Sequence, residues 1–253
     1  GRAGVGGFQI YTTIDPALQK AAEESMRKRL GQVETQPQYQ HQTFAQYKTI
    51  LEDYKGKLST GAINPATPRP KPEYLQGAAL VMDNKDGSIL AMVGGRDFTD
   101  SQYNRALASS RPVGTAFLPF VYAAAFSQPG FFPGTQLEDA PIDNKRVMIG
   151  GFTGILGEWG TEAAESKWTM AGISARESLV NSRNATTVRL GEKVGVPALK
   201  EFATKAGIQS PLKDYPSSYL GASEAKLDEM CLAYSIFANK GMRPKEMHLI
   251  HRI

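Results

Sequence analysis

The stretch that decides the fold covers residues 78–95 and reads AALVMDNKDGSILAMVGG. Two apolar runs, residues 78–82 and 89–93, are joined by the polar segment 83–87, which ends in glycine. Short apolar runs joined by such a turn predict a β-hairpin. Because the runs are apolar at consecutive positions and not only at alternate ones, we expect other elements to cover both faces of the hairpin.

The chain before the hairpin predicts a strand, a helix and a linker. Residues 8–14 are rich in β-branched and aromatic types, which favours a strand. Asp15 before Pro16 is typical of a helix N-terminus, and apolar residues then recur at helical spacing to about residue 33. Residues 34–74 are rich in Gln, Tyr, Lys and Pro, so we expect a linker or surface excursion with one helix in its middle. The helix would use Phe44, Tyr47, Ile50, Leu51 and Tyr54. We therefore divide the chain into an N-terminal segment of strand, helix and linker, residues 1–74, and a second domain, residues 75–253.

The chain after the hairpin is mostly helical in pattern. Helical spacing of apolar residues is found at about 116–126, 170–180, 186–194, 197–206 and 227–237. Gly241 is a stop signal for the last of these helices, and residues 247–253 alternate weakly, as a strand does. The predicted fold class is α+β, an antiparallel sheet flanked by helices.

Composition excludes several classes of protein. The chain has 253 residues, of which 41% are hydrophobic and 21% charged, which is typical of a folded globular protein. Its net charge of +4 comes without a basic cluster, so we expect no nucleic-acid partner. Its single cysteine excludes an internal disulfide and a multi-cysteine zinc site. We also expect no membrane segment and no signal peptide, since no long apolar run is present.

Three passages become informative when they are taken together. They are GGRDF at 94–98, RPVGTAFLPF at 111–120, and Ser182-Arg183-Asn184. In this order and spacing the chain resembles the transpeptidase domain of class A penicillin-binding proteins. Residues 10–19 and 220–239 resemble segments of the same family, so the resemblance covers nearly the whole chain.

The resemblance implies a penicillin-binding protein transpeptidase or β-lactamase-like fold and D,D-transpeptidase chemistry, which is acyl transfer to an active-site hydroxyl. The family uses the motifs Ser-x-x-Lys, Ser-x-Asn and Lys-Thr-Gly. A hydroxyl is a poor nucleophile without a neighbouring base, and the lysine one turn on handles the proton of the serine. The implied ligands are the peptidoglycan stem peptide or a β-lactam, without a cofactor or metal. The implied location is the extracytoplasmic face of the bacterial inner membrane (the periplasm), with a glycosyltransferase domain in the same parent chain.

The chain departs from the family at the first motif. Residues 114–119 read GTAFLP, so Thr115 occupies the nucleophile position and Leu118 the position of the base, which is lost. Pro119 is tolerated in a first helical turn, so we expect one helix that presents residues 115 and 118 on the same face. Leucine cannot accept a proton, so we favour a capping role for Thr115 and a packing role for Leu118 over a working threonine nucleophile.

The second and third motifs differ in how well they are kept. Ser182 and Asn184 match Ser-x-Asn as they stand, although a short motif of this kind also occurs as a helix cap. No Lys-Thr-Gly is present, so the chain is expected to be truncated before the last strands of the domain, with a sheet edge left open to association. The family's Thr-Pro at the start of the last long helix is replaced by Lys226-Leu227, which costs about 1 kcal/mol if a cap is missing.

Three functions remain open from the sequence. The first is a catalytically impaired transpeptidase domain of a bacterial peptidoglycan-synthesis protein, which keeps some affinity for stem peptide. The second is an architectural or peptide-binding module that supports a neighbouring glycosyltransferase domain. The third is a live D,D-transpeptidase that uses Thr115.

Other residues are given structural roles. His41, His248 and His251 lack a third ligand for a metal. Trp159 and Trp168 are expected in the core or lining a groove. Cys231 is expected to be a buried hydrophobic residue.

Overall fold

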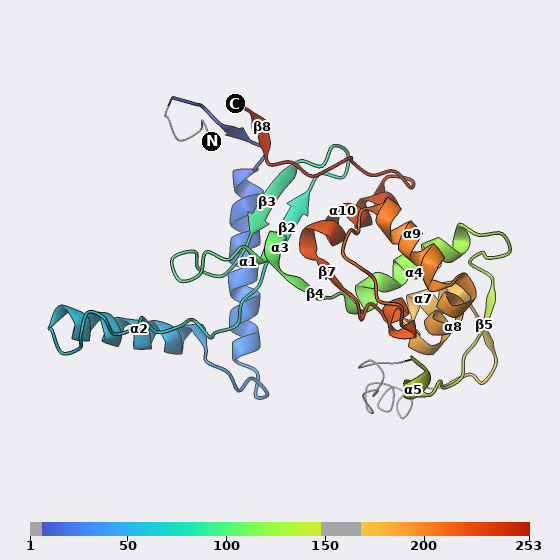
Figure 1. The fold of residues 1–253 in the computed structure, drawn as a ribbon, viewed down its shortest axis with the longest axis horizontal. Helices are drawn as coiled ribbons and strands as arrows, with labels where there is room; N and C mark the ends of the chain where they lie inside the picture. The colour runs from blue at the N-terminus through green and yellow to red at the C-terminus, as the bar shows by residue number, and fades with distance from the viewer. Residues whose placement is uncertain (1–6, 148–167) are drawn as a thin grey trace. The chain divides into compact units, whose positions relative to one another are not determined.

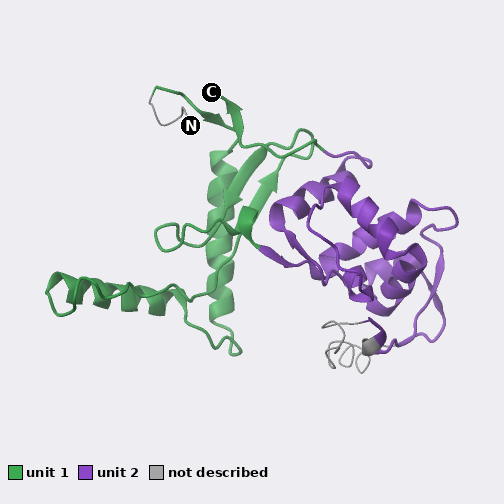
Figure 2. Cartoon of the chain, in the orientation of Figure 1, with its two compact units in different colours: residues 1–109, 244–253 green, residues 110–243 purple. Residues whose placement is uncertain are grey.

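The computed structural model describes residues 7–147 and 168–253. It divides into two compact units, residues 1–109 with 244–253 and residues 110–243 (Figure 2). The described strands form four antiparallel pairs, each of two strands, and helices make up most of the rest (Figure 1). The predicted mixture of helices and antiparallel strands is confirmed, although in place of one sheet the described residues hold small separate ones. The predicted domain boundary after residue 74 stays a prediction.

The first unit is built on the hairpin. Its elements are β1 (Tyr11–Thr12), α1 (Pro16–Glu34), α2 (Phe44–Ser59), β2 (Ala79–Met82), β3 (Ile89–Val93), α3 (Arg105–Ala108) and β8 (Ile250–Arg252). β2 and β3 pair antiparallel, with Ala79 opposite Val93 and Val81 opposite Ala91. α1 packs on this hairpin, and β8 pairs with β1. The predicted hairpin is confirmed.

α1 begins where the sequence predicted. The carboxylate of Asp15 accepts hydrogen bonds from the backbone N–H groups of Ala17 and Leu18, and Pro16 occupies the first turn. These bonds satisfy two of the donors that a helix N-terminus leaves without partners.

The outer edge of β3 is closed by groups that do not form a strand. The backbone N–H of Asp15 donates to the carbonyl of Leu90, and the N–H of Arg105 donates to the carbonyl of Gly94. Between them, the side-chain amide of Gln19 accepts from the N–H of Met92 at 2.8 Å and donates to its carbonyl at 3.1 Å. One side chain thus replaces the pair of hydrogen bonds that a neighbouring strand would make.

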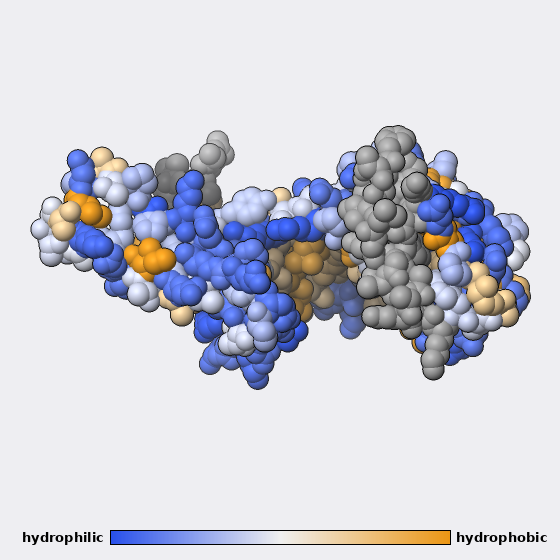
Figure 3. Space-filling view, turned by 90° about the horizontal axis from the view of Figure 1, so that it is seen from below, coloured by the Kyte–Doolittle hydropathy of each residue, from blue (hydrophilic) through white to orange (hydrophobic). Residues whose placement is uncertain are grey.

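Residues 35–74, the α2 excursion, contain the single helix that was predicted. Thr43 and Gln46 form a capping box at its start, and Tyr47 and Leu51 pack with Tyr74 in a small separate core. Figure 3 shows this part at the left as mainly hydrophilic, with separate hydrophobic spots.

Ion pairs fasten the α2 excursion and the end of α1 to residues 94–104. Arg96 binds both carboxylate oxygens of Glu34, and both side chains are nearly buried. Lys48 on α2 binds Asp97 and Asp100, each at 2.8 Å. Hydrogen bonds from Lys48 and Thr99 lower the pKa of Asp97 to about 2.

The lowered pKa of Asp97 predicts acid sensitivity. A carboxylate with a lower pKa in the folded state stabilises that state above its unfolded pKa, near 4, and this stabilisation disappears as the pH falls towards 2. We expect the free energy of unfolding to fall by about 1–2 kcal/mol over this window from Asp97 alone. Urea unfolding between pH 5 and pH 2.5 measures it. Lys48→Met keeps most of the apolar stem of the side chain and removes its charge. An equal acid profile for this variant and the wild type would contradict the assignment.

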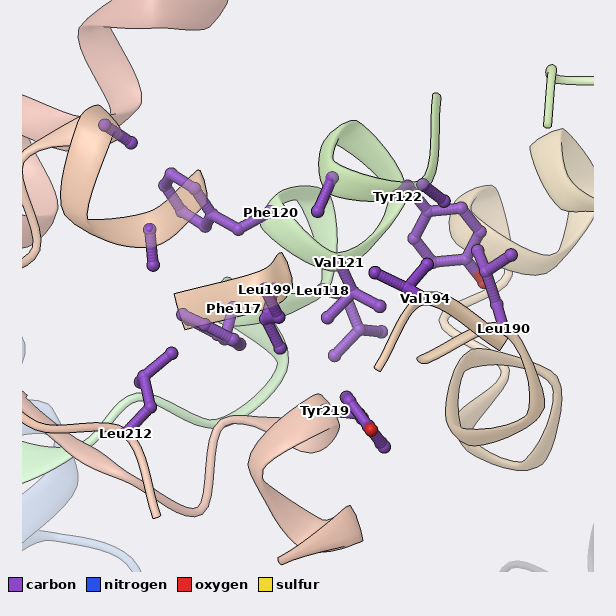
Figure 4. Packing of buried hydrophobic residues seen from close by; sticks show 14 of the residues in the cluster. Phe117, Leu118, Phe120, Val121, Tyr122, Leu190, Val194, Leu199, Leu212 and Tyr219 are labelled. Atoms are coloured by element: carbon purple, nitrogen blue, oxygen red, sulfur yellow. The ribbon is translucent and has the colours of Figure 1, made fainter. Parts of the chain in front are cut away.

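The second unit is mainly helical. Its elements are β4 (Ser110–Pro112), η2 (Gly114–Phe117), α4 (Leu118–Phe126), β5 (Gln136–Glu138), α5 (Asn144–Val147), β6 (Gly172–Ser174), α7 (Ala175–Val180), α8 (Asn184–Val194), α9 (Val196–Ala206), η4 (Pro216–Leu220), β7 (Glu224–Lys226) and α10 (Leu227–Ala238). α4 lies in the middle of the core and packs against α7, α8 and α9 (Figure 4). The helices predicted near 186–194, 197–206 and 227–237 are confirmed.

Two predicted helices differ from the structure. Residues 170–180 do not form one helix, because residues 172–174 pair with β5 and the helix starts only after Ser174, which forms a capping box with Glu177. The helix predicted at 116–126 is divided into the 3₁₀ turn η2 and the α-helix α4.

α10 lacks a side-chain cap, as expected. Lys226 is the N-cap residue and makes no capping hydrogen bond. Asp228 accepts from the N–H of Glu229, and both acidic residues lie in the first turn, where negative charge is favourable. Cys231 on this helix is only partly buried, so the prediction of a buried hydrophobic residue is wrong in degree. Burial still raises the pKa of its thiol.

Candidate active site

Backbone contacts fix the turn that carries Thr115. β4 pairs with β7 just before it, and the N–H of Gly114 donates to the carbonyl of Gly221 at 2.9 Å. Both glycines have positive φ, 61° and 73°. A Cβ at Gly221 would lie 2.1 Å from the carbonyl oxygen of Gly114. The glycine at 221 is therefore required by conformation and by space.

α10 holds the same turn from a second direction. The hydroxyl of Tyr234 donates to the carbonyl of Ala116 at 2.6 Å. Thr115 itself is exposed. Its predicted capping role is wrong, because Phe117 is the N-cap residue of α4 and no side chain caps that helix.

Leu118 is part of the core. Only 1% of its surface is exposed, and Figure 4 shows it among Phe117, Val121 and Leu199. The predicted packing role is confirmed. Thr115 lies in the 3₁₀ turn and faces solvent, whereas Leu118 opens the α-helix and is buried, so the single helical face expected for both residues does not form.

Ser182 and Asn184 lie in the tight turn between α7 and α8. The N–H of Ser182 donates to the carbonyl of Leu179, and the N–H of Arg183 donates to the carbonyl of Ser178. Ser182 is exposed and has a φ of 51°, which is uncommon for a residue other than glycine. Asn184 is the first residue of α8. Neither residue caps α8, because the N-cap is Arg183 and it makes no side-chain capping bond.

A buried carboxylate holds the middle residue of this turn. Asp139 has no exposed surface, and its Oδ2 lies 3.4 Å from Nη2 of Arg183 and accepts from the N–H of Thr169. The guanidinium of Arg183 also lies 5.7 Å from the ring centroid of Trp168, which is partly buried against the core as expected. Trp159 lies outside the described residues. Sequence reasoning missed Asp139, because nothing local distinguishes it from other acidic residues.

α4 is bonded to the elements on both sides of the Ser182–Asn184 turn. The hydroxyl of Tyr122 lies 2.5 Å from that of Ser178 on α7 and 2.9 Å from that of Thr187 on α8. Burial raises the pKa of Tyr122, so its phenol is neutral at physiological pH. The spacing of four residues from Leu118 was the available signal, since it places Tyr122 one turn further along the helix.

Thr115 presents an exposed hydroxyl. In residues 7–147 and 168–253, no hydrogen bond joins a basic side chain to the hydroxyl of Thr115. Over the same ranges, no group of three or more His, Cys, Asp or Glu side chains could hold a metal ion. None of the helices described has both the length and the hydrophobicity that crossing a bilayer requires.

Comparison with known proteins gives consistent matches. Residues 77–245 match the family described as "Penicillin binding protein transpeptidase domain". Penicillin-binding protein 1A of Neisseria meningitidis serogroup A is 33% identical over 182 residues, which are 71% of this chain and 22% of the relative. The chain thus spans about a fifth of the length of the curated relatives that it matches.

Two solved structures show the same fold. Penicillin-binding protein 1A from Haemophilus influenzae has a TM-score of 0.68 at 22% identity, over 95% of this chain and 43% of that one. Penicillin-binding protein A from M. tuberculosis, solved as a penicillin G acyl-enzyme complex, has a TM-score of 0.59 at 19% identity, over 95% of this chain and 54% of that one.

Proposed function

Because the chain belongs to the family of penicillin-binding protein transpeptidase domains, we propose that it binds the D-alanyl end of a peptidoglycan stem peptide, or a β-lactam, without becoming acylated. The site is the exposed hydroxyl of Thr115 together with the turn that carries Ser182 and Asn184. The parent protein would act in cell-wall synthesis on the extracytoplasmic face of the bacterial inner membrane, with a glycosyltransferase domain in the same chain.

The observation that carries the proposal is the burial of Leu118. Acylation of a hydroxyl requires a group that removes its proton as the bond to the carbonyl carbon forms. Leu118 holds the position where the family has its lysine, and it is packed into the apolar core with 1% of its surface exposed. Nucleophile and base act as a unit, and loss of one member of such a unit costs on the order of 10⁶ in rate.

Binding does not need that base. The turn around Ser182 is held by backbone hydrogen bonds, and the turn around Thr115 is held by Gly221 and Tyr234. These hydrogen bonds keep polar groups of both turns in fixed positions. Such preorganisation supports affinity for a peptide even where no covalent acyl bond forms.

Intact-mass spectrometry after incubation with penicillin G tests the absence of acylation. We expect no covalent adduct over hours, whereas penicillin-binding protein A of M. tuberculosis, which forms a penicillin G acyl-enzyme, serves as the positive control. An increase in mass by one penicillin molecule, mapped to Thr115, would instead establish a working threonine nucleophile.

Titration with a tripeptide that ends in D-Ala-D-Ala tests the binding half. We expect weak, saturable binding, with the largest NMR amide shifts at Thr115, Ser182 and Asn184. The same tripeptide ending in L-Ala-L-Ala is the control. Equal binding of the two peptides, or no binding at all, would favour the purely architectural alternative.

A further inference from the structure

Four buried hydroxyls and one backbone carbonyl form a closed ring beneath the Ser182–Asn184 turn. The carbonyl of Arg183 accepts from Thr186 at 3.0 Å and from Thr187 at 2.7 Å. Thr187 contacts Tyr122, Tyr122 contacts Ser178, and Ser178 contacts Thr186, which closes the ring. Tyr122 is the only member from α4, and the other members come from α7, α8 and the turn itself.

The ring is one proton short. It contains five oxygen–oxygen contacts, and each of its four hydroxyls can donate one proton, whereas the carbonyl donates none. At least one contact therefore holds no hydrogen bond, whichever way the hydroxyls point. Each of the four hydroxyls can still donate one hydrogen bond and lie close to a second oxygen. Every hydroxyl donor is therefore satisfied, although not every contact in the ring is a hydrogen bond.

From this ring we infer that the hydroxyl of Tyr122 is a positioning group, which fixes the Ser182–Asn184 turn relative to α4. The bonds from Thr186 and Thr187 to the carbonyl of Arg183 stay within α8 and its first turn. Only the contacts of Tyr122 join α4, the helix that begins at Leu118, to the ring. Figure 4 shows Tyr122 beside Leu190 of α8, at the end of the cluster away from Phe117.

Because the ring has fewer protons than contacts, the Tyr122 hydroxyl can be removed with little loss of folding stability. A positioning effect of this hydroxyl can therefore be measured apart from an effect on stability. Without the hydroxyl of Tyr122, three contacts and three hydroxyl protons remain, so each proton keeps an oxygen within reach. The carbonyl of Arg183 then shares the two threonine hydroxyls with the backbone N–H of Thr187, the same three groups that contact it in the wild type. The variant Tyr122→Phe should therefore unfold within about 2 °C of the wild type. Ser178→Ala also leaves three contacts and three protons, but it keeps the contact between Tyr122 and Thr187. Each variant keeps as many hydroxyl protons as contacts, and the two differ in whether a hydrogen bond still joins α4 to α8.

Amide hydrogen exchange measures the link without any ligand. The N–H groups of Ser182 and Arg183 exchange when the turn opens, since both are bonded inside it. In Tyr122→Phe we expect their exchange to accelerate by about tenfold or more, and in Ser178→Ala by less than about threefold. Tyr54→Phe removes a hydroxyl that donates to the carbonyl of Thr67 in the first unit, and it should leave the turn unchanged.

Two outcomes would overturn the inference. Equal exchange rates in Tyr122→Phe and Ser178→Ala would show that the link to α4 does not hold the turn. A Tyr122→Phe protein that unfolds far below the wild type would show that the proton count is wrong and that the hydroxyl is structural.

The consequence for binding rests on the proposed function. We expect affinity for the D-Ala-D-Ala tripeptide to fall about tenfold in Tyr122→Phe and to change little in Ser178→Ala. If the wild type binds no such peptide, the proposed function fails, and the exchange rates still decide whether Tyr122 positions the turn.

Discussion

The variant Gly221→Ala is expected to lose about 3–5 kcal/mol of folding free energy, which is a large fraction of the total stability of a typical domain. Two effects combine at this residue. Its φ of 73° is unfavourable for any residue with a Cβ, and the added Cβ would lie 2.1 Å from the carbonyl oxygen of Gly114. The contact is with backbone, so no side chain can rotate away. Relief requires the turn that carries Thr115 to move.

Gly130→Ala is the matched control for this prediction. Gly130 lies in the same unit with a φ of 87°, and nothing lies within 4 Å of an added Cβ. It should therefore cost only the conformational strain, about 1–2 kcal/mol. Urea unfolding of the two variants measures the difference. Equal losses would show that the contact between Gly221 and Gly114 is not tight in solution.

Leu118→Lys is expected to destabilise the protein by about 3–5 kcal/mol at pH 7. The amine would enter a position with 1% exposure among apolar side chains, and such burial lowers the pKa of a lysine. A lysine whose folded-state pKa lies below its unfolded value binds its proton more readily when unfolded. The stability of the variant should therefore rise with pH between about 7 and 10, by up to ~1.4 kcal/mol per pH unit.

Leu118→Met separates charge from shape. It keeps the apolar character and the approximate volume, so it should cost less than about 1.5 kcal/mol, with no added dependence on pH. Unfolding curves at pH 7, 8.5 and 10 compare the two variants. A Leu118→Lys protein as stable as Leu118→Met at pH 7 would show that the new ammonium finds hydrogen-bond acceptors in the folded state.

Local signals explain the elements that the sequence predicted well. Asp15 and Pro16 mark the start of α1 by their own chemistry, and the turn before Gly87 marks the hairpin. Gly241 follows the end of α10 closely. In each case the residues that specify the element are its own or adjacent to it, so one stretch of sequence is enough.

The sequence predictions fail where residues far apart in the chain determine the local structure. β6 has three residues and exists because it pairs with β5, which lies more than thirty positions earlier in the chain. Thr115 was expected to cap a helix, but it lies in a separate 3₁₀ turn. Hydrogen bonds of its two neighbours hold that turn, Gly114 with Gly221 and Ala116 with Tyr234. These pairings depend on the folded arrangement, and the spacing of apolar residues carries no information about them.

In the candidate site, too, some residues could be located from the sequence and one could not. The motif spacing located Thr115, Leu118, Ser182 and Asn184, and their functional roles stay predictions. Tyr122 carries no signal beyond helical spacing, since its importance depends on hydroxyls more than fifty residues away.

The side-chain amide of Gln19 also bears on whether a second chain could add to the edge of β3. An open strand edge is a template on which a second polypeptide can add its own strand and start a fibril. On β3 that template is blocked at Met92, because the amide already occupies the N–H and the carbonyl that an incoming strand would need. A side chain of α1 thus blocks strand addition at this edge of the hairpin. Protection against fibril growth at this edge is then only as durable as the docking of α1, so conditions that loosen that helix would uncover the template before the hairpin itself unfolds.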